Sequence, residues 1–218
     1  MVIFDCNGVL VDSEPIANAV LAEALARVGI PLSAENVASR FHGRRPADVF
    51  AAVERVTGKT LPPAFATEVS AETVRRFRRE LRPLPHVAHA LTWLRGPKAV
   101  ASSSPLDRIR AGLEVAGLIR YFGPHLFSAS DVAKGKPAPD LFRYAAAKLA
   151  VDAGSCIVIE DSVPGVAAAA AAGMTAIGFV GGNATPGRLA NDLINAGART
   201  VIADMRALKS AVADIRGW

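Results

Sequence analysis

Cysteines and long apolar runs are scarce in this chain of 218 residues, and their absence excludes several classes of protein. Two cysteines, Cys6 and Cys156, are too few for a disulfide framework. This favours a reducing compartment, so we expect a cytoplasmic protein. No uninterrupted apolar run reaches the roughly 20 residues that a membrane span needs. The N-terminus lacks a basic segment followed by an apolar one, and we expect neither a membrane segment nor a secretory signal.

Aromatic residues are also few, at 6% of the chain, while the net charge is +5. A protein that binds RNA through its bases needs aromatic side chains for stacking, so we expect no nucleic-acid partner. One basic run stands out, but Val74, Phe77 and Leu81 recur within it at helical spacing. We interpret its arginines as the solvated face of an amphipathic helix. The run consists of Arg75, Arg76, Arg78, Arg79 and Arg82.

Half of the residues are apolar, which indicates a globular protein large enough for a core and a small accessory domain. The apolar segment 1–4 predicts a buried strand that delivers Asp5 at its carboxyl end. Gly8 then allows a sharp turn. Asp5 in this position is a candidate nucleophile or metal ligand, although a turn former or helix cap has the same local pattern.

The rest of the chain divides into two patterns. Residues 14–81 show helical periodicity without a convincing buried strand, and Ser33 is the expected N-cap of one of the helices. Residues 82–218 alternate between helices and short apolar strands, which predicts βαβ units and a parallel sheet. We therefore expect an α/β core formed by 1–13 and 82–218, into which 14–81 are inserted as a helical cap.

Three further polar clusters follow predicted strands. Ser102 and Ser103 come directly after an apolar strand and before a helix, where they can cap the helix or bind an anion. Lys136 lies in a stiff Gly-Lys-Pro loop, either as a surface lysine or as a fixed charge for phosphoryl oxygens. Glu160 and Asp161 follow a very apolar strand, where two adjacent charges need a compensating cation. Carboxylate oxygens suit Mg²⁺.

Four segments in this order resemble the motifs of the haloacid dehalogenase superfamily, in its phosphatase and β-phosphoglucomutase-like branch with a helical cap. They are Asp5-Cys-Asn-Gly-Val, Ser102-Ser-Ser, Gly135-Lys-Pro-Ala-Pro-Asp and Glu160-Asp161. The resemblance covers the whole chain. It implies a Rossmann-like core and a Mg²⁺-dependent phosphatase that acts on a small phosphorylated metabolite, such as a sugar phosphate.

The same resemblance implies a role for each position. Asp5 would attack phosphorus and form an aspartyl-phosphate. Ser102 and Lys136 would hold the phosphoryl group, with Ser103 next to the substrate. The metal ligands would be Asp5, the backbone carbonyl of Asn7, Asp161, and Glu160 directly or through water. Lys134 is the less favoured of the two neighbouring lysines.

Asn7 departs from the family pattern, which has a second aspartate at this position. An amide cannot donate or accept a proton as a carboxylic acid does, and acid–base catalysis contributes about 10²–10⁴-fold. We therefore expect a slow phosphatase, or a protein that stalls at a bound phosphate ester. Three explanations remain open: a deliberate change that traps a complex, a natural paralogue with weakened activity, or another proton donor such as His42 in the cap.

The cap is expected to set the substrate specificity. Gly43, Arg44 and Arg45 lie in a cap loop that faces the active site in related enzymes, and one arginine would contact the substrate; a solvated pair is the alternative. The cap histidine of β-phosphoglucomutase falls at Ala17, which lowers the odds of a phosphomutase. For the assembly we expect a monomer or a weak dimer.

Overall fold

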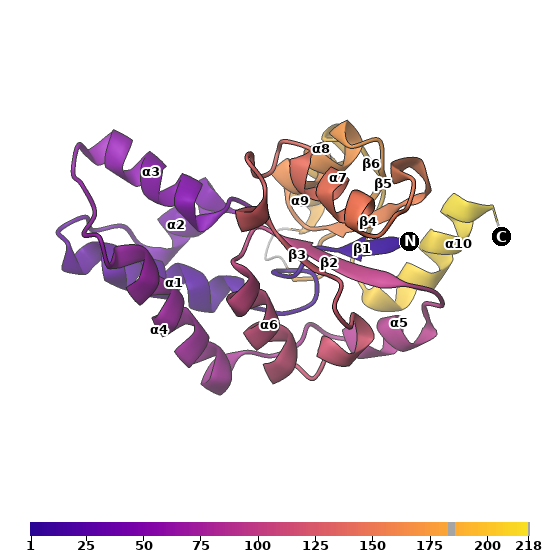
Figure 1. Ribbon diagram of the computed structural model, residues 1–218, viewed down its shortest axis with the longest axis horizontal. Coiled ribbons are helices and arrows are strands. Elements are labelled where there is room, and N and C mark those ends of the chain that lie inside the picture. The colour runs from indigo at the N-terminus through magenta and orange to yellow at the C-terminus, as the bar shows by residue number, and fades with distance from the viewer. Residues whose placement is uncertain (183–185, 218) are drawn as a thin grey trace.

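The fold of the computed structural model, which describes residues 1–182 and 186–217, is a parallel α/β sheet with helices on both faces and a helical cap at one end (Figure 1). The sheet has the order β3-β2-β1-β4-β5-β6, with all paired strands parallel. The strands are β1 (Val2–Phe4), β2 (Lys98–Ser102), β3 (Leu126–Ser128), β4 (Ile157–Glu160), β5 (Thr175–Phe179) and β6 (Ala198–Ile202). The predicted α/β architecture is confirmed.

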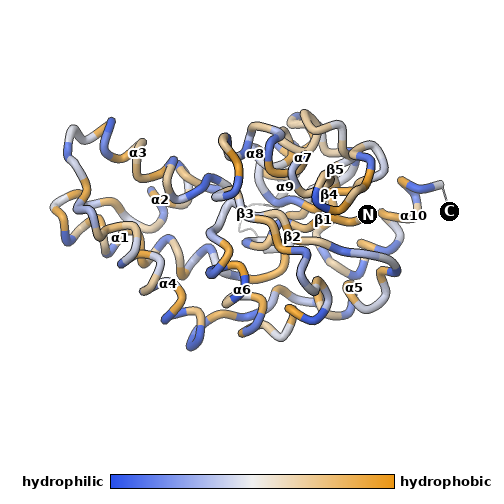
Figure 2. The backbone as a smooth tube through the Cα atoms, viewed as in Figure 1, coloured by the Kyte–Doolittle hydropathy of each residue, from blue (hydrophilic) through white to orange (hydrophobic). Residues whose placement is uncertain are grey.

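Alternate residues of the central strands pack on opposite faces, because successive side chains of a strand point to opposite sides. Val2 and Phe4 join one core cluster, whereas Ile3 joins the other. The first face is covered by α5 (Val87–Trp93), α6 (Leu106–Val115) and α10 (Leu208–Arg216). The second is covered by α7 (Asp140–Lys148), α8 (Val163–Ala171) and α9 (Pro186–Asn195). The strands are mostly hydrophobic in Figure 2, as expected for strands buried on both sides.

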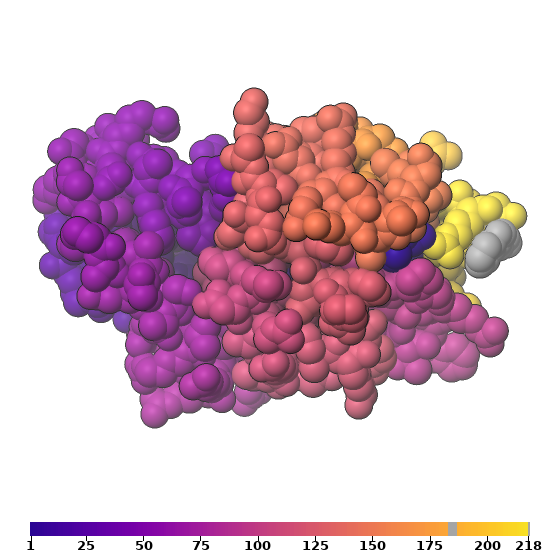
Figure 3. All heavy atoms as spheres, viewed as in Figure 1, coloured from indigo at the N-terminus to yellow at the C-terminus, as the bar shows by residue number. Residues whose placement is uncertain are grey.

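The cap consists of four helices between β1 and α5. They are α1 (Glu14–Arg27), α2 (Ala34–Phe41), α3 (Pro46–Thr57) and α4 (Phe65–Glu80). These helices enclose a separate hydrophobic cluster that includes Val20, Leu25 and Phe65. Ile16 and Phe77 instead pack into the main core, so the two ends of the cap are anchored to the sheet domain. In Figure 3 the cap forms a lobe that lies directly against the core.

Several local predictions are confirmed by the side chains. Ser33 caps α2, since its hydroxyl accepts a hydrogen bond from the Asn36 N–H. Arg75 and Arg76 on α4 pair with Glu72, in agreement with a solvated helix face. The two cysteines are free thiols. No helix in the described ranges is long and apolar enough to cross a membrane.

β6 is followed by a separate 3₁₀ turn (Met205–Ala207) and then by α10. The Asp204 side chain closes this turn, because it accepts the Arg206 N–H at 2.8 Å.

Candidate active site

The carboxyl ends of three neighbouring strands bring the predicted site residues together. β1 pairs with β2 on one side and with β4 on the other, so that Phe4 lies opposite both Val100 and Ile159. Asp5 continues this register, and its N–H donates to the Ile159 carbonyl at 2.9 Å. In Figure 1, β1 runs from the N-terminus toward the cap. Asp5 is therefore presented at the centre of the sheet, below the cap.

Lys136 holds Asp5 from the loop that precedes α7. Its buried ammonium donates to Asp5 Oδ1 at 2.6 Å and also contacts Glu160 Oε1. Burial by itself lowers the pKa of Lys136, but the two carboxylates outweigh this effect and raise it. Lys134 is exposed, so it is Lys136 that reaches the site.

Burial raises the pKa of Asp5 to about 8, with further upward contributions from Glu160 and Asp161 that Lys136 only partly offsets. Two carboxylates thus share one ammonium, and a third, that of Asp161, is near enough to raise the pKa of Asp5. Within the described ranges, Asp5 accepts a side-chain hydrogen bond only from Lys136, which leaves Oδ2 available to a ligand or substrate. The environment favours the arrival of a further cation beside Asp5.

Both oxygens of the Glu160 carboxylate already have partners in the protein. While Oε1 contacts Lys136, Oε2 accepts hydrogen bonds from the N–H and the hydroxyl of Ser162, at 3.1 and 2.9 Å. Gly165 in α8 permits this packing, because a Cβ there would lie 2.0 Å from the Glu160 carboxyl carbon. Of the two roles expected for Glu160, the arrangement fits contact with a metal through water better than direct ligation.

Asp161 lies against the loop after β1. Gly8 has a φ of +70°, and a Cβ on it would be 1.9 Å from Asp161 Oδ2, so the close approach requires glycine. The helix cap at this point is Ser162, whose hydroxyl accepts the Gly165 N–H. Because Ser162 provides the cap, the Asp161 carboxylate is free to face the site.

His42, at the end of α2 in the cap, reaches across to this carboxylate. Its Nε2 lies 3.1 Å from Asp161 Oδ2. Burial by itself lowers the pKa of His42, but the bond to Asp161 and the nearby Glu14 and Glu160 raise it to about 10. The histidine considered as an alternative proton donor is therefore over the site, and it is paired with Asp161.

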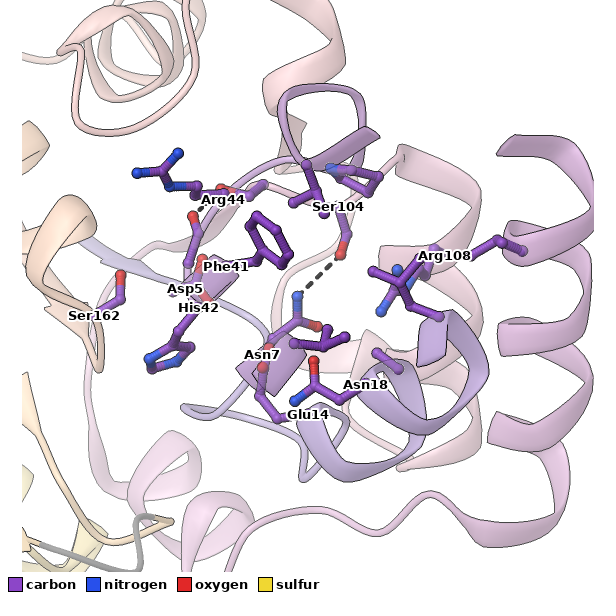
Figure 4. Close-up of a pocket in the computed structure, with 18 of the residues that line it drawn as sticks. Asp5, Asn7, Glu14, Asn18, Phe41, His42, Arg44, Ser104, Arg108 and Ser162 are labelled. Atoms are coloured by element: carbon purple, nitrogen blue, oxygen red, sulfur yellow. Dashed lines mark hydrogen bonds between the residues drawn. The ribbon is translucent and has the colours of Figure 1, made fainter. Parts of the chain in front are cut away.

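Asn7 is held on both sides of its amide group. Its nitrogen donates to Ser104 Oγ and its oxygen accepts from Ser13 Oγ, each at 2.9 Å. Asn7, Asp5 and Ser104 line the same cavity (Figure 4). Asn7 thus lies at the site, at the position that the sequence indicated.

Ser102 is the last residue of β2 and lies in the core, whereas the two serines that follow it line the cavity. Ser102 is fully buried, and its Oγ accepts the Ser104 N–H at 3.3 Å. Ser103 and Ser104 line the cavity instead. Ser103 also donates to the Gly43 carbonyl at 2.9 Å, which joins the core to the cap.

The three expected cap residues have different surroundings. Gly43 has a φ of +75°, and a Cβ there would be 2.6 Å from Ser162 Oγ, so this glycine lets the cap close on the core. Arg44 is exposed and lines the cavity. Arg45 pairs with Asp48 and reaches the carbonyls of Ala129 and Val132. It thus contacts the core rather than the cavity around Asp5.

The donors near Asp5 fit a magnesium ion that keeps part of its water shell. In the described ranges no three His, Cys, Asp or Glu side chains are grouped closely enough to hold a metal alone. Mg²⁺ is commonly bound by one or two carboxylates together with waters and substrate phosphate. Asp5, Asp161 and the Asn7 carbonyl match that donor set, and the excess of negative charge around Lys136 provides the electrostatic reason.

The sequence interpretation missed three further residues of the cavity wall: Glu14, Asn18 and Arg108. Burial raises the pKa of Glu14 and lowers that of Arg108. One signal was available for Arg108. It lies in the first turn of α6, where the helix dipole disfavours a positive charge.

The fold and the site define a parallel α/β protein whose polar centre lies at the strand ends, under an inserted helical cap. Comparisons with known proteins specify the family. The family model described as haloacid dehalogenase-like hydrolase matches residues 1–173. The chain belongs to this family, in its phosphatase branch, and is an enzyme of the hydrolase type.

Three relatives illustrate the match. The chain is 33% identical over 179 residues to 6-phosphogluconate phosphatase of Escherichia coli K12, covering 82% of this chain and 81% of that protein. It is 31% identical over 177 residues to fructose-1-phosphate phosphatase of the same organism, covering 80% and 93%. A hydrolase from Deinococcus radiodurans R1, solved with bound phosphate and sodium, has 33% identity and a TM-score of 0.72, covering 98% and 94%.

Proposed function

We propose that the protein is a Mg²⁺-dependent phosphomonoesterase that hydrolyses a small sugar phosphate through an aspartyl-phosphate on Asp5. One observation carries the proposal: the Asp5 carboxylate has one oxygen held by Lys136 and the other free, at the edge of a cavity that Asp161 also lines. The relatives named as phosphatases of 6-phosphogluconate and fructose 1-phosphate support the substrate class.

In this reaction the free oxygen of Asp5 attacks phosphorus while the bond to the sugar oxygen breaks. The Lys136 ammonium fixes Asp5 and stabilises the charge on the phosphoryl oxygens. Ser103, on the cavity wall after the adjacent strand, lies next to the same group, whereas the Ser102 hydroxyl would reach it only by leaving its contact with the Ser104 N–H. Water then attacks the phosphorus of the aspartyl-phosphate, which releases inorganic phosphate and restores Asp5.

Magnesium would be held by Asp5, Asp161 and the Asn7 carbonyl, with Glu160 acting through water. When bound, the ion screens the repulsion between the carboxylates and the anionic substrate. The close approach of Asp161 to Gly8 supports this assignment, since it holds the second carboxylate against the loop that carries Asp5 and Asn7.

Asn7 is proposed to limit the rate. It occupies the acid–base position but can only donate or accept hydrogen bonds, so the leaving sugar oxygen must take its proton from elsewhere. This observation favours a second candidate function, a phosphate-ester-binding protein with residual hydrolysis. The two candidates differ in turnover and share the binding site.

Phosphate release from a panel of sugar phosphates, with Mg²⁺ or with EDTA, tests the proposal. We expect slow release that EDTA abolishes and Mg²⁺ restores, together with a phosphoryl adduct on Asp5 detected by mass spectrometry. Tight binding of an ester without release would favour the second candidate. Release that is insensitive to EDTA, or that survives Asp5→Asn, would refute the mechanism.

Asn7→Asp should raise the turnover of an aryl phosphate by at least about tenfold, because it restores an acid–base group. Asn195→Asp is the matched control, since it makes the same change at an exposed position of α9 that does not line the cavity. The initial rate with Mg²⁺ is the measurement. An equal effect of the two variants, or no gain from either, would show that Asn7 is not at the acid–base position.

A further inference from the structure

Arg108 is a cation on the cavity wall that makes no ion pair with the residues that the structure describes. Its Nε is buried and has no hydrogen-bond partner among the described residues. The guanidinium lies over the Phe77 ring, whose centroid is 5.5 Å from Cζ. Glu14 and Asp107 favour the charged form of this half-buried arginine without forming an ion pair with it, so a bound anion would supply the direct partner.

The position of Arg108 relative to Asp5 indicates which part of a substrate it would meet. Both residues line the same cavity, and in Figure 4 they lie on opposite sides of it, with Asn7 between them. A phosphoryl group at Asp5 therefore directs the rest of the substrate toward Arg108. Asn18 and Glu14 lie on the same wall and can bind hydroxyl groups on the way.

The other cations of the cavity are less suited to this task. His42 is already bound to Asp161. Arg44 is exposed, so solvent and salt screen its charge. Glu14 lines the cavity too, but it is not in ion-pair contact with Arg108.

We propose that Arg108 is the specificity-determining residue of the site and binds a carboxylate at the far end of the substrate, so that the preferred substrates are phosphorylated sugar acids. A guanidinium matches a carboxylate through two parallel hydrogen bonds, whereas an alcohol at the same place leaves it without an anion. This inference rests on the proposed function, but it concerns binding and can be tested apart from turnover.

The test compares two ligands that differ only at the far end: 6-phosphogluconate and sorbitol 6-phosphate, in which a CH₂OH group replaces the carboxylate. Dissociation constants are measured by calorimetry with Mg²⁺, and kcat/KM by phosphate release. We expect the protein to bind 6-phosphogluconate about 10- to 100-fold more tightly, the range for a hydrogen-bonded charged group. Arg108→Gln should remove this preference while changing sorbitol 6-phosphate binding by less than about threefold.

Two further variants separate specificity from structure. Arg110→Gln makes the same change at an exposed position of α6 and should keep the full preference. Arg44→Gln should keep most of it, because that arginine is exposed. Circular dichroism and thermal unfolding show whether Arg108→Gln is folded. If Arg108→Gln does not fold, the two dissociation constants of the unaltered protein remain a test, because the inference requires tighter binding of 6-phosphogluconate than of sorbitol 6-phosphate.

The inference is overturned if the unaltered protein does not distinguish the two ligands, if the preference survives Arg108→Gln, or if that variant weakens both ligands equally, as a purely structural role on Phe77 would. A failure of the proposed function looks different. In that case no ester releases phosphate, while the comparison of dissociation constants still determines the role of Arg108.

Discussion

Gly8→Ala tests whether the closeness of Asp161 to the loop after β1 is needed for metal binding. The substitution has two separable effects. The φ of +70° costs an alanine about 1–2 kcal/mol in the left-handed region. The new Cβ would also lie 1.9 Å from Asp161 Oδ2 and 2.8 Å from its carboxyl carbon, so the carboxylate must move.

Gly58→Ala isolates the first of these effects. Gly58 ends α3 with a φ of +67°, and no atom lies within 4 Å of the position that its Cβ would take. Both variants should therefore lose about 1–2 kcal/mol of unfolding free energy. Only Gly8→Ala displaces a proposed metal ligand, and disturbing the groups that orient ligands typically costs about 10–100-fold in metal affinity.

Urea denaturation in EDTA measures the stability of each variant, and calorimetric titration with Mg²⁺ measures its affinity independently of turnover. We expect similar stability losses, with Mg²⁺ affinity at least about tenfold weaker in Gly8→Ala alone. If the two variants bound Mg²⁺ within about twofold of each other, Asp161 would not be a ligand and the assignment of the metal site would be wrong.

Two further predictions concern Lys136 and Arg45. Lys136→Met should lower the unfolding free energy by about 3–5 kcal/mol in urea denaturation, because it leaves two buried carboxylates unpaired. Lys134→Met, at an exposed position, should cost less than about 0.5 kcal/mol. Arg45→Gln removes the link from the cap to two core carbonyls and should raise hydrogen exchange at the cap–core contact about tenfold. Arg55→Gln, at an exposed position of α3, should leave this hydrogen exchange unchanged. Equal exchange rates in the two variants would show that Arg45 does not hold the cap against the core.

The order of helices and strands was predictable because local chemistry decides it. The strand β4 begins with three apolar residues, Ile157, Val158 and Ile159, a pattern typical of a strand buried on both faces, and it ends at Glu160. The residues that end each central strand follow from the same logic, since parallel strands place their carboxyl ends at one edge. Asp5 and Glu160 were accordingly expected at one edge of the sheet. Lys136, in the loop before α7, was expected there only from the family resemblance, and it contacts both carboxylates.

The walls of the cavity were not predictable in the same way. Whether Arg44 or Arg45 faces the cavity depends on how the loop after α2 settles on the core, and no local pattern distinguishes them. The orientation of Glu160 depends on Ser162 and on the absence of a side chain at Gly165. These contacts form only once the sheet, α8 and the cap are packed together.

The surroundings of Asn7 bear on the meaning of its departure from the family pattern. Its two partners, Ser13 and Ser104, are hydroxyl groups, which can donate to a carboxylate as readily as they bind an amide. An aspartate would therefore keep both contacts without any rearrangement of the loop. The surroundings of residue 7 would accommodate an aspartate, and the chain lacks only the ionisable carboxyl group at this position. It follows that Asn7→Asp should change the rate far more than the stability, whereas a defect in both would mean that the site has adapted to the amide.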